Sequence, residues 1–213
     1  MNIDFKKMSP SQRYFAMVQT IIPRPIAWVL SDNGEQVDAD IARYNLAPFS
    51  FFTAVCSDPP LLMFSSGKKP SGREAGRVKD TSKNIAERKH FVVHIASVDL
   101  VGPLNQSAET LDHGVSELER AGLSTEAFDG FSLPRIAGCP VAIGCNLHRI
   151  DEIGNTPQSV IYGEIERMFV DERAISPGQE RLVLDPTVIN PLSRLGGNEY
   201  SGLGDLIRVA RPK

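Results

Sequence analysis

The sequence has few cysteines, and they follow no familiar pattern. Its 213 residues include three, Cys56, Cys139 and Cys145. An odd number without C-x-x-C or another metal-ligand spacing predicts neither a disulfide framework nor a metal site. The N-terminal residues also lack the basic start, apolar run and small-residue cleavage site of a secretory signal. We therefore expect a protein without a metal ion in a reducing, cytoplasmic environment.

Long apolar runs and blocks of positive charge are missing as well. No apolar run reaches the ~18 residues of a membrane-spanning helix, because Arg24 interrupts the first candidate and Asp58 the second. The net charge is -3, without a block of Lys and Arg, which argues against nucleic acid or an anionic membrane as the main partner. We expect a soluble protein that binds neither.

Two common nucleotide-binding motifs are absent. Gly196, Gly197, Gly202 and Gly204 do not form G-x-G-x-x-G after a strand. The segment from Gly67 to Gly72 is followed by Arg and Glu, where a P-loop needs Lys and then Ser or Thr. The sequence therefore gives no support for a Rossmann or P-loop nucleotide site.

Most of the chain has the pattern of antiparallel strands. Arg24 to Ser31 is predicted to be a strand, and Asp32-Asn33-Gly34 offers the positive-φ residues of a tight hairpin turn. Its partner is expected over Glu35 to Arg43. Asp58-Pro59-Pro60 predicts a turn between two further strands. The remaining predicted strands are Leu61 to Ser66, Phe91 to Ala96, Val141 to Ile153 and Ser159 to Val170.

Helical signals are sparse. Lys79 to Lys89 is predicted to be a helix with Asp80 or Thr81 as its N-cap. Asp99 to Gly122 is interpreted as an excursion outside the sheet, with a short helical stretch over Val115 to Ala121. Many strands and few helices favour a mainly β fold, an antiparallel barrel or sandwich. We expect one domain over residues 1–213, which should bury roughly 70 to 75% of its unfolded surface.

The segment from Asn45 to Gly67 indicates a cofactor site. It joins small, aromatic and hydroxyl side chains to two strand-like runs, the second of which ends in two serines. Val, Phe and Thr favour a pleated backbone. A flat ring is expected to lie there, with its polar tail anchored nearby.

A phosphate site is predicted where the second of these strands ends and the helix begins. Free N–H groups and the positive end of a helix dipole attract an anion. Each charge-assisted hydrogen bond contributes roughly 1.5 to 3 kcal/mol, whereas Asp80 opposes the anion. The alternative is that Thr81 only caps the helix and Asn84 is a surface residue. The candidate phosphate ligands are Ser65, Ser66, Lys79, Thr81 and Asn84.

Six segments, in order, resemble the flavin reductase-like family of FMN-binding split barrels, which includes flavoredoxins and the reductase partners of two-component monooxygenases. The resemblance covers most of the chain. Its carriers are Arg24-Pro-Ile-Ala, Asn45-Leu-Ala-Pro-Phe-Ser-Phe-Phe with Asp58-Pro-Pro-Leu, Lys79-Asp-Thr-x-x-Asn-Ile, Phe91-Val-Val, Gly114-Val-x-Glu-Leu-Glu-Arg-Ala-Gly-Leu, and Pro191-Leu-Ser-Arg-Leu-Gly-Gly-x-x-Tyr200.

The resemblance implies a Greek-key split β-barrel that forms a homodimer, with FMN rather than FAD at the subunit interface. Residues Ala47 to Phe51 would face the isoalloxazine ring, where Pro48 shapes the approach without donating a hydrogen bond. Arg24 would approach the phosphate or a negatively charged substrate. The implied cofactor-binding residues are Arg24, Asn45, Ala47, Pro48, Phe49, Ser50, Phe51, Ser65, Ser66, Lys79, Asp80, Thr81 and Asn84.

The sequence also departs from the family pattern. Reductases that use nicotinamide often carry Gly-Asp-His between the last two long strands, and here the stretch is Gly154-Asn155-Thr156. Direct oxidation of NAD(P)H is therefore in question, and no catalytic residue is assigned. His94 is interpreted as a hydrogen-bonded barrel histidine, with an approach to the site as the alternative.

Four other side chains have open or structural interpretations. Cys56 is expected to be a small buried thiol, with a place near the flavin as the alternative. Trp28 is expected to pack in the core, with stacking on the flavin as the alternative. Arg194 and Tyr200 either close over the site or join the dimer contact.

Three functions are compatible with these features. The first is an FMN-dependent oxidoreductase that takes hydride from NAD(P)H and passes electrons to flavin or another acceptor, with a monooxygenase as a possible protein partner. The second is a flavoredoxin-like carrier that moves electrons between redox proteins without NAD(P)H turnover. The third is a non-catalytic flavin-binding module or dimeric scaffold.

Overall fold

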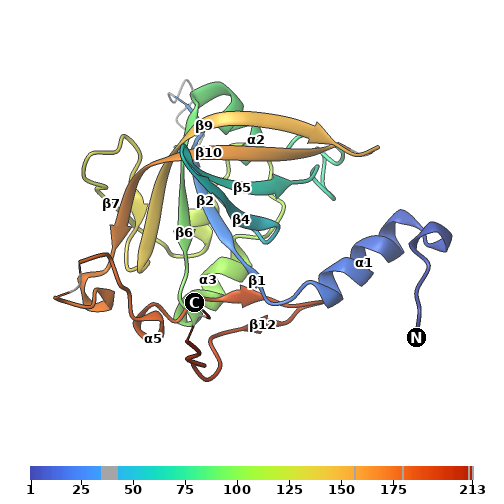
Figure 1. Cartoon of the computed structure of the whole chain (residues 1–213). Coiled ribbons are helices and arrows are strands. Elements are labelled where there is room, and N and C mark those ends of the chain that lie inside the picture. The colour runs from blue at the N-terminus through green and yellow to red at the C-terminus, as the bar shows by residue number, and fades with distance from the viewer. Residues whose placement is uncertain (35–42, 156, 179, 211, 213) are drawn as a thin grey trace.

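A curled antiparallel sheet forms the body of the computed structural model, which describes residues 1–34, 43–155, 157–178, 180–210 and 212 (Figure 1). Along the sheet the strands run in the order β3-β2-β6-β9-β10-β5-β4. The two edge strands, β3 and β4, follow each other in the chain. The two ends of the curled sheet approach each other, since the Phe49 ring of β3 lies 4.9 Å from the Phe64 ring of β5. The strands are β2 (Ala27–Asp32), β3 (Tyr44–Phe49), β4 (Phe52–Ser57), β5 (Pro60–Ser66), β6 (His90–Ile95), β9 (Val141–Ile153) and β10 (Gln158–Val170).

Short helices and two small sheets surround this body. The helices are α1 (Pro10–Thr20), α2 (Asp80–Arg88), α3 (Val101–Gln106), α4 (Glu117–Arg120) and α5 (Pro186–Ile189), with 3-10 turns η1 (Phe5–Lys7), η2 (Val98–Leu100) and η3 (Glu172–Ala174). One small sheet joins β1 (Arg24–Pro25), β11 (Ser193–Arg194) and β12 (Tyr200–Ser201), and the other pairs β7 (Thr125–Glu126) with β8 (Arg135–Ile136).

The central strand β2 is buried on both faces, which explains its nearly continuous apolar sequence. Side chains alternate between the two faces of a strand. Val29 accordingly packs in the cluster inside the barrel, with Phe91 and with Ile85 of α2. Trp28 and Leu30 pack in a second cluster, beneath the segments outside the sheet. The predicted core role of Trp28 is confirmed, since its side chain is fully buried and its Nε1 donates to Ser107 Oγ at 2.8 Å.

One glycine is needed for this packing. Gly163 lies in β10, beside a break in the strand register with β9. A Cβ atom at this position would collide with the ring of Phe91 and crowd the Cβ of Cys145. The absence of a side chain therefore lets the Phe91 ring fill the barrel.

Local sequence signals predicted several elements closely. β9 has the predicted bounds and β10 begins one residue earlier than predicted. Residues 58 and 59 connect β4 and β5, close to the predicted turn, and α2 lies within the predicted helix. Residues 99–122, which are all described, contribute no strand to the sheet. The helical stretch predicted there is observed as the shorter α4, and α3 in the same segment was not predicted.

Two local predictions were wrong. The first is the tight hairpin after β2: Asp32 pairs with Tyr44, so the strand that follows β2 in the hairpin is β3, and the connection is longer than a tight turn. Most of the predicted partner strand, residues 35–42, lies outside the described residues. The N-cap of α2 is Lys79, and neither Asp80 nor Thr81 caps the helix. Since Asp80 and Thr81 already have helical positions, their side chains are directed to other partners.

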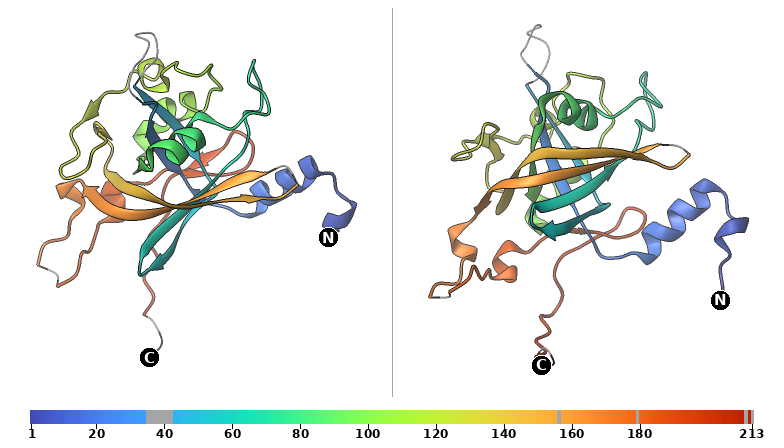
Figure 2. Two further views of the ribbon diagram at one scale, coloured as in Figure 1. Left: turned by 90° about the horizontal axis from the view of Figure 1, so that it is seen from above. Right: turned by 45° about the horizontal axis from the view of Figure 1, so that its top comes forward.

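The N-terminal arm projects from the barrel (Figures 1 and 2). Of the eleven residues of α1, which are all described, only Val18 is buried. The Arg24 guanidinium holds the base of the arm, because Nη1 donates to the Val18 and Ile21 carbonyls at 2.7 and 2.9 Å. Its Nη2 donates to the Leu195 carbonyl at 2.8 Å. Arg24 thus has a clear structural role.

Candidate functional site

The end of β5 and the start of α2 are brought together by a short hairpin-like connection. Lys68 and Val78 form an antiparallel bridge, and the Lys69 N–H donates to the Arg77 carbonyl at 2.8 Å. Lys79 follows directly as the N-cap of α2. The two segments that the sequence nominated for phosphate binding therefore lie at the same end of the barrel.

A pocket of about 100 Å³ lies at the N-terminus of α2. Its walls come from β3, from the first turn of α2 and from the segment after α3. It contains six of the sequence-predicted residues and several that the sequence did not nominate. The lining residues are Asn45, Ala47, Pro48, Lys69, Lys79, Asp80, Thr81, Ser107, Ala108, Glu109, Thr110, Leu111 and Glu117.

The first turn of α2 offers unpaired positive charge to this pocket. Its N-cap makes no side-chain hydrogen bond to the first-turn N–H groups, which leaves backbone donors for a ligand. The Lys79 ammonium lies 5.3 Å from the centre of the Phe49 ring. Burial lowers the pKa of Lys79, and no carboxylate among the described residues offsets that effect. A partly buried ammonium without a counterion favours an anionic ligand.

Asp80 opposes an anion less than its sequence position suggested. Its carboxylate accepts from Lys69 Nζ at 2.8 Å and lies 3.0 Å from His113 Nδ1. Lys69 is buried, and it also donates to Glu74 at 2.5 Å. Burial lowers the pKa of Lys69, but the hydrogen bonds to Asp80 and Glu74 outweigh it and the pKa is raised. The negative charge of Asp80 is therefore largely neutralised within the protein.

Thr81 is positioned to donate into the pocket. Asn45 Nδ2 donates to Thr81 Oγ1 at 2.9 Å, and both side chains are buried. Because this hydroxyl oxygen already accepts one hydrogen bond, its own O–H is directed to another acceptor. Asn45 thus orients Thr81 and gives both predicted residues a defined place in the site.

Glu117, like Lys69, is a charged residue of the pocket that the sequence prediction missed. Its Oε2 accepts from the Leu46 N–H at 3.1 Å. The pKa of Glu117 is raised to about 7, mainly by burial and to a lesser extent by Asp80, against the hydrogen bonds from the Leu46 N–H and its own N–H and against the charge of Lys69. The only sequence signal for Glu117 was its place in the Gly114-Val-x-Glu segment, and Lys69 stood in the excluded Gly67 to Gly72 loop.

A second hollow of about 150 Å³ adjoins the first. Both are lined by Pro48 and Ala108, and the second also contains Ser50, Arg194 and Tyr200. The Arg194 guanidinium lies 4.4 Å from the centre of the Tyr200 ring, and the Tyr200 hydroxyl donates to Asn105 Oδ1 at 3.0 Å. Of the two sequence interpretations, this placement favours Arg194 and Tyr200 as walls of the site.

Several predicted ligands lie outside the first pocket. Ser65 and Ser66 are consecutive in β5 and so point to opposite faces of the strand. Ser66 is buried, and its hydroxyl is 3.5 Å from the Gly67 carbonyl. Asn84 donates to Ser31 Oγ and Asn33 Oδ1 at 3.1 and 2.7 Å, which ties α2 to the end of β2. These three residues do not line the pocket.

The segment predicted to face the flavin ring, Ala47 to Phe51, also lies only partly along the first pocket. Phe49 packs inside the barrel and Ser50 lines the second hollow. Arg24 Nε donates to Ser50 Oγ at 3.3 Å but does not line either hollow. Phe51 is exposed, and its ring lies 6.4 Å from that of Tyr14 in α1.

The structure resolves two interpretations that concerned reactive side chains. His94 is fully buried, and the Ile136 N–H donates to its Nε2 at 3.0 Å. Its Nδ1 must then carry the proton and donate to the Trp28 carbonyl at 3.0 Å; His94 is a structural barrel histidine, as predicted. The prediction of a buried Cys56 was wrong, because β4 is an edge strand and the thiol is exposed.

Within the described residues, no group of three or more His, Cys, Asp and Glu side chains is arranged to hold a metal ion. Over the same residues, no helix has the length and apolar character required to cross a bilayer.

Comparison with known proteins agrees with the fold. A model of the "Flavin reductase like domain" matches residues 18–188, and the chain therefore belongs to the flavin reductase-like family. It is 34% identical over 212 residues to the uncharacterized protein YwrF of Bacillus subtilis, covering 97% of this chain and 96% of that one.

Solved structures confirm the split-barrel prediction. The fold is similar to that of nitrilotriacetate monooxygenase component B from Bacillus cereus, with a TM-score of 0.85, 29% identity and 98% of each chain covered. A protein with a split barrel domain from Shewanella frigidimarina has a TM-score of 0.81 over 100% of both chains at 17% identity, which concerns the fold alone.

The residues around the pocket are chemically suited to the phosphate end of a flavin nucleotide. Its volume of about 100 Å³ is small beside the roughly 300 to 1,000 Å³ of a typical small-molecule pocket, which suits a phosphate group better than a tricyclic ring. The lining offers the free Lys79 ammonium, the Thr81 hydroxyl and uncapped helix N–H groups.

Proposed function

We propose that this protein binds FMN and is an oxidoreductase that moves electrons from NAD(P)H to flavin or to another acceptor. The main support is the unneutralised Lys79 ammonium beside the uncapped start of α2, in a pocket of phosphate size. When bound, FMN would supply the electron-transfer chemistry, and the protein would bind, orient and shield it. FMN is favoured over FAD because FMN ends at its phosphate, and a pocket of about 100 Å³ offers little room for a further nucleotide.

The roles of the chain's own residues follow from their positions. Lys79 and Thr81 would hold the phosphate, and Asn45 would keep the Thr81 hydroxyl directed toward it. Ala47 and Pro48 would present a small, apolar edge to the cofactor. Phe49 would support this edge from inside the barrel.

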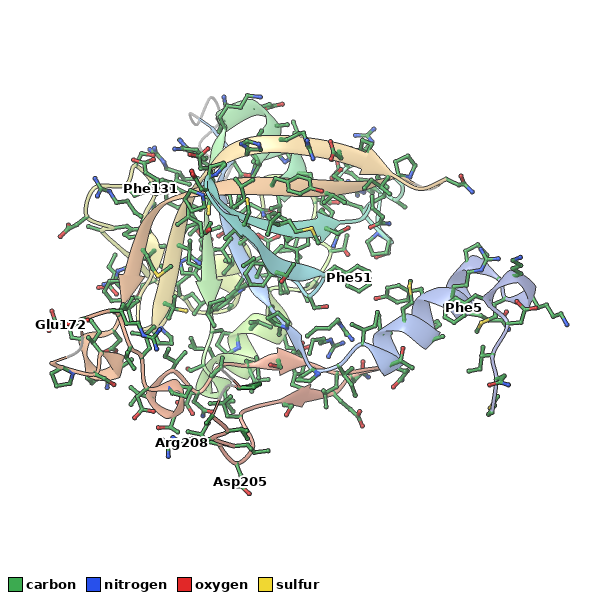
Figure 3. The ribbon with its side chains drawn as sticks, viewed as in Figure 1. Phe5, Phe51, Phe131, Glu172, Asp205 and Arg208 are labelled. Atoms are coloured by element: carbon green, nitrogen blue, oxygen red, sulfur yellow. The ribbon has the colours of Figure 1, made fainter. Side chains whose placement is uncertain are left out.

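We further propose that a second copy of the chain covers the ring. The aromatic side chains Tyr14, Phe15 and Phe51 are 52%, 56% and 38% exposed, and the rings of Tyr14 and Phe51 lie 6.4 Å apart. Figure 3 shows Phe51 at the edge of the barrel on the side from which α1 projects. Exposed apolar groups of this kind mark interaction surfaces, and a homodimer of single-domain chains in the cytoplasm would use them.

A flavoredoxin-like electron carrier is the second candidate function. Gly154 and Asn155 stand where nicotinamide-using relatives often carry Gly-Asp-His, and residue 156 lies outside the described residues. Of the four histidines of the chain, which are all described, His113 contacts a residue of the pocket, through Asp80, while His94 is buried in the barrel wall. A monooxygenase or redox protein would be the partner of either form.

One titration separates these functions. The purified protein is loaded with FMN, its visible spectrum is recorded, and NADH or NADPH is added under anaerobic conditions. Bleaching of the flavin band within seconds supports the reductase. Bleaching with dithionite but not with either nicotinamide supports the carrier, and a colourless protein that ignores added FMN contradicts both and leaves a scaffold.

A further inference from the structure

A buried carboxylate lies in the wall of the pocket to which we assign the phosphate. The Glu117 side chain, 7% exposed as a residue, reaches the pocket from the start of α4. Its Oε2 accepts from the Leu46 N–H of edge strand β3 at 3.1 Å. An ionised carboxylate here would share a small, weakly hydrated space with the charge of the ligand.

The nearby cations do not compensate both an ionised Glu117 and an anionic ligand. Lys69 is already shared between Asp80 and Glu74, so Lys79 is the cation of the pocket with no acidic partner among the described residues. The titratable and charged groups that face Glu117 are Lys79 and Asp80 from α2, Lys69 with Glu74 from the β5–α2 connection, Glu109 from the segment after α3, and His113 through Asp80.

We propose that Glu117 takes up a proton when the phosphate end of the cofactor binds, so that this residue makes FMN affinity depend on pH. This inference rests on the proposed function. One proton moves from solvent to a Glu117 oxygen, and the Leu46 N–H continues to donate to the carboxyl group. The pocket then contains the phosphate, the Lys79 ammonium and a neutral acid.

The pH range follows from the burial of the side chain. Burial raises the pKa of Glu117 to about 7 in the free protein. Below that pH the acid is already neutral, and binding requires no proton from it. Above it, each pH unit should lower FMN affinity by up to about tenfold, because one proton must be bound with the ligand. The phosphate of FMN itself titrates near pH 6, below this range.

The test uses the full-length protein and measures FMN binding by flavin fluorescence at pH 6.5, 7.5 and 8.5. The wild-type protein should lose affinity between pH 7.5 and 8.5 by up to about tenfold. Glu117→Gln keeps an oxygen that accepts from Leu46, so it should bind FMN with little dependence on pH and more tightly than wild type at pH 8.5. Glu119→Gln, on the exposed side of the same helix, and His113→Gln should keep the wild-type dependence.

A second measurement needs no variant. Calorimetric titration of the wild-type protein with FMN at pH 7.5, in buffers of different ionisation heat, should show uptake of roughly three quarters of a proton. Riboflavin, which lacks the phosphate, should show less uptake.

The outcomes distinguish this inference from the proposed function. FMN binding with equal affinity from pH 6.5 to 8.5 and no proton uptake would overturn the role of Glu117 while leaving FMN binding intact. Loss of the pH dependence in His113→Gln would also overturn it. Absence of FMN binding at every pH would overturn the proposed function and this inference together.

Discussion

Replacing Lys79 by Met should weaken FMN binding without weakening the fold. The ammonium lies in the candidate phosphate pocket and has no carboxylate partner among the described residues. Its hydrogen bond to a phosphate should contribute roughly 1.5 to 3 kcal/mol. Since 1.4 kcal/mol corresponds to tenfold in affinity, the Lys79→Met variant should bind FMN about 10- to 150-fold more weakly.

The same substitution should have the opposite effect on the cofactor-free protein. Burial lowers the pKa of Lys79, so the folded state disfavours its charge. A methionine of similar length can still lie over the Phe49 ring, which the Lys79 ammonium faces at 5.3 Å, and it removes that charge. The free energy of unfolding of Lys79→Met in urea should therefore equal or exceed the wild-type value.

Flavin fluorescence quenching measures the binding part of this prediction with matched controls. Riboflavin affinity should be nearly unchanged in Lys79→Met, because riboflavin has no phosphate. Lys83→Met, which removes an exposed lysine from the same helix, should bind FMN as wild type does. An FMN affinity within threefold of wild type, or an equal loss for riboflavin, would refute the assignment of Lys79.

Three further predictions concern stability. Burial lowers the pKa of His94 to about 4, so the stability that its neutral form provides is lost as pH falls from 6.5 to 4. Urea unfolding should show a loss of roughly 3 kcal/mol over this range. An equal loss in the His94→Gln variant would contradict this prediction. The pKa of Glu117 is raised, so the stability of the protein falls as pH rises from 4.5 through 7. In thermal unfolding, Glu117→Gln should therefore be more stable than wild type at pH 8 but not at pH 5. Gly163→Ala should lower stability by about 1 to 3 kcal/mol because of the contact with Phe91, and an unchanged melting temperature would show that the barrel accommodates the methyl group.

Local patterns predicted elements whose ends are set by nearby residues. β9 starts and stops as predicted because an apolar run is followed by Gly154, which has a positive φ. The hairpin after β2 was mispredicted although Gly34 does have a positive φ. β2 pairs instead with Tyr44–Phe49. The register of such a pair depends on burial across the sheet rather than on the turn residues.

The site was predicted where one segment carries it and missed where distant segments meet. Lys79 and Thr81 line the pocket, whereas Ser65 and Ser66 cannot both face it, because side chains alternate along a strand. Glu117 enters the pocket through its hydrogen bond to Leu46, 71 positions away. No spacing in the sequence indicates that contact.

A crystal structure of the protein grown with FMN would test the phosphate site most directly. We predict that the phosphate oxygens lie within hydrogen-bonding distance of Lys79 Nζ, Thr81 Oγ1 and the first N–H groups of α2. A bound flavin whose phosphate lies outside this pocket, for example beside Ser65 on the far face of β5, would contradict the assignment.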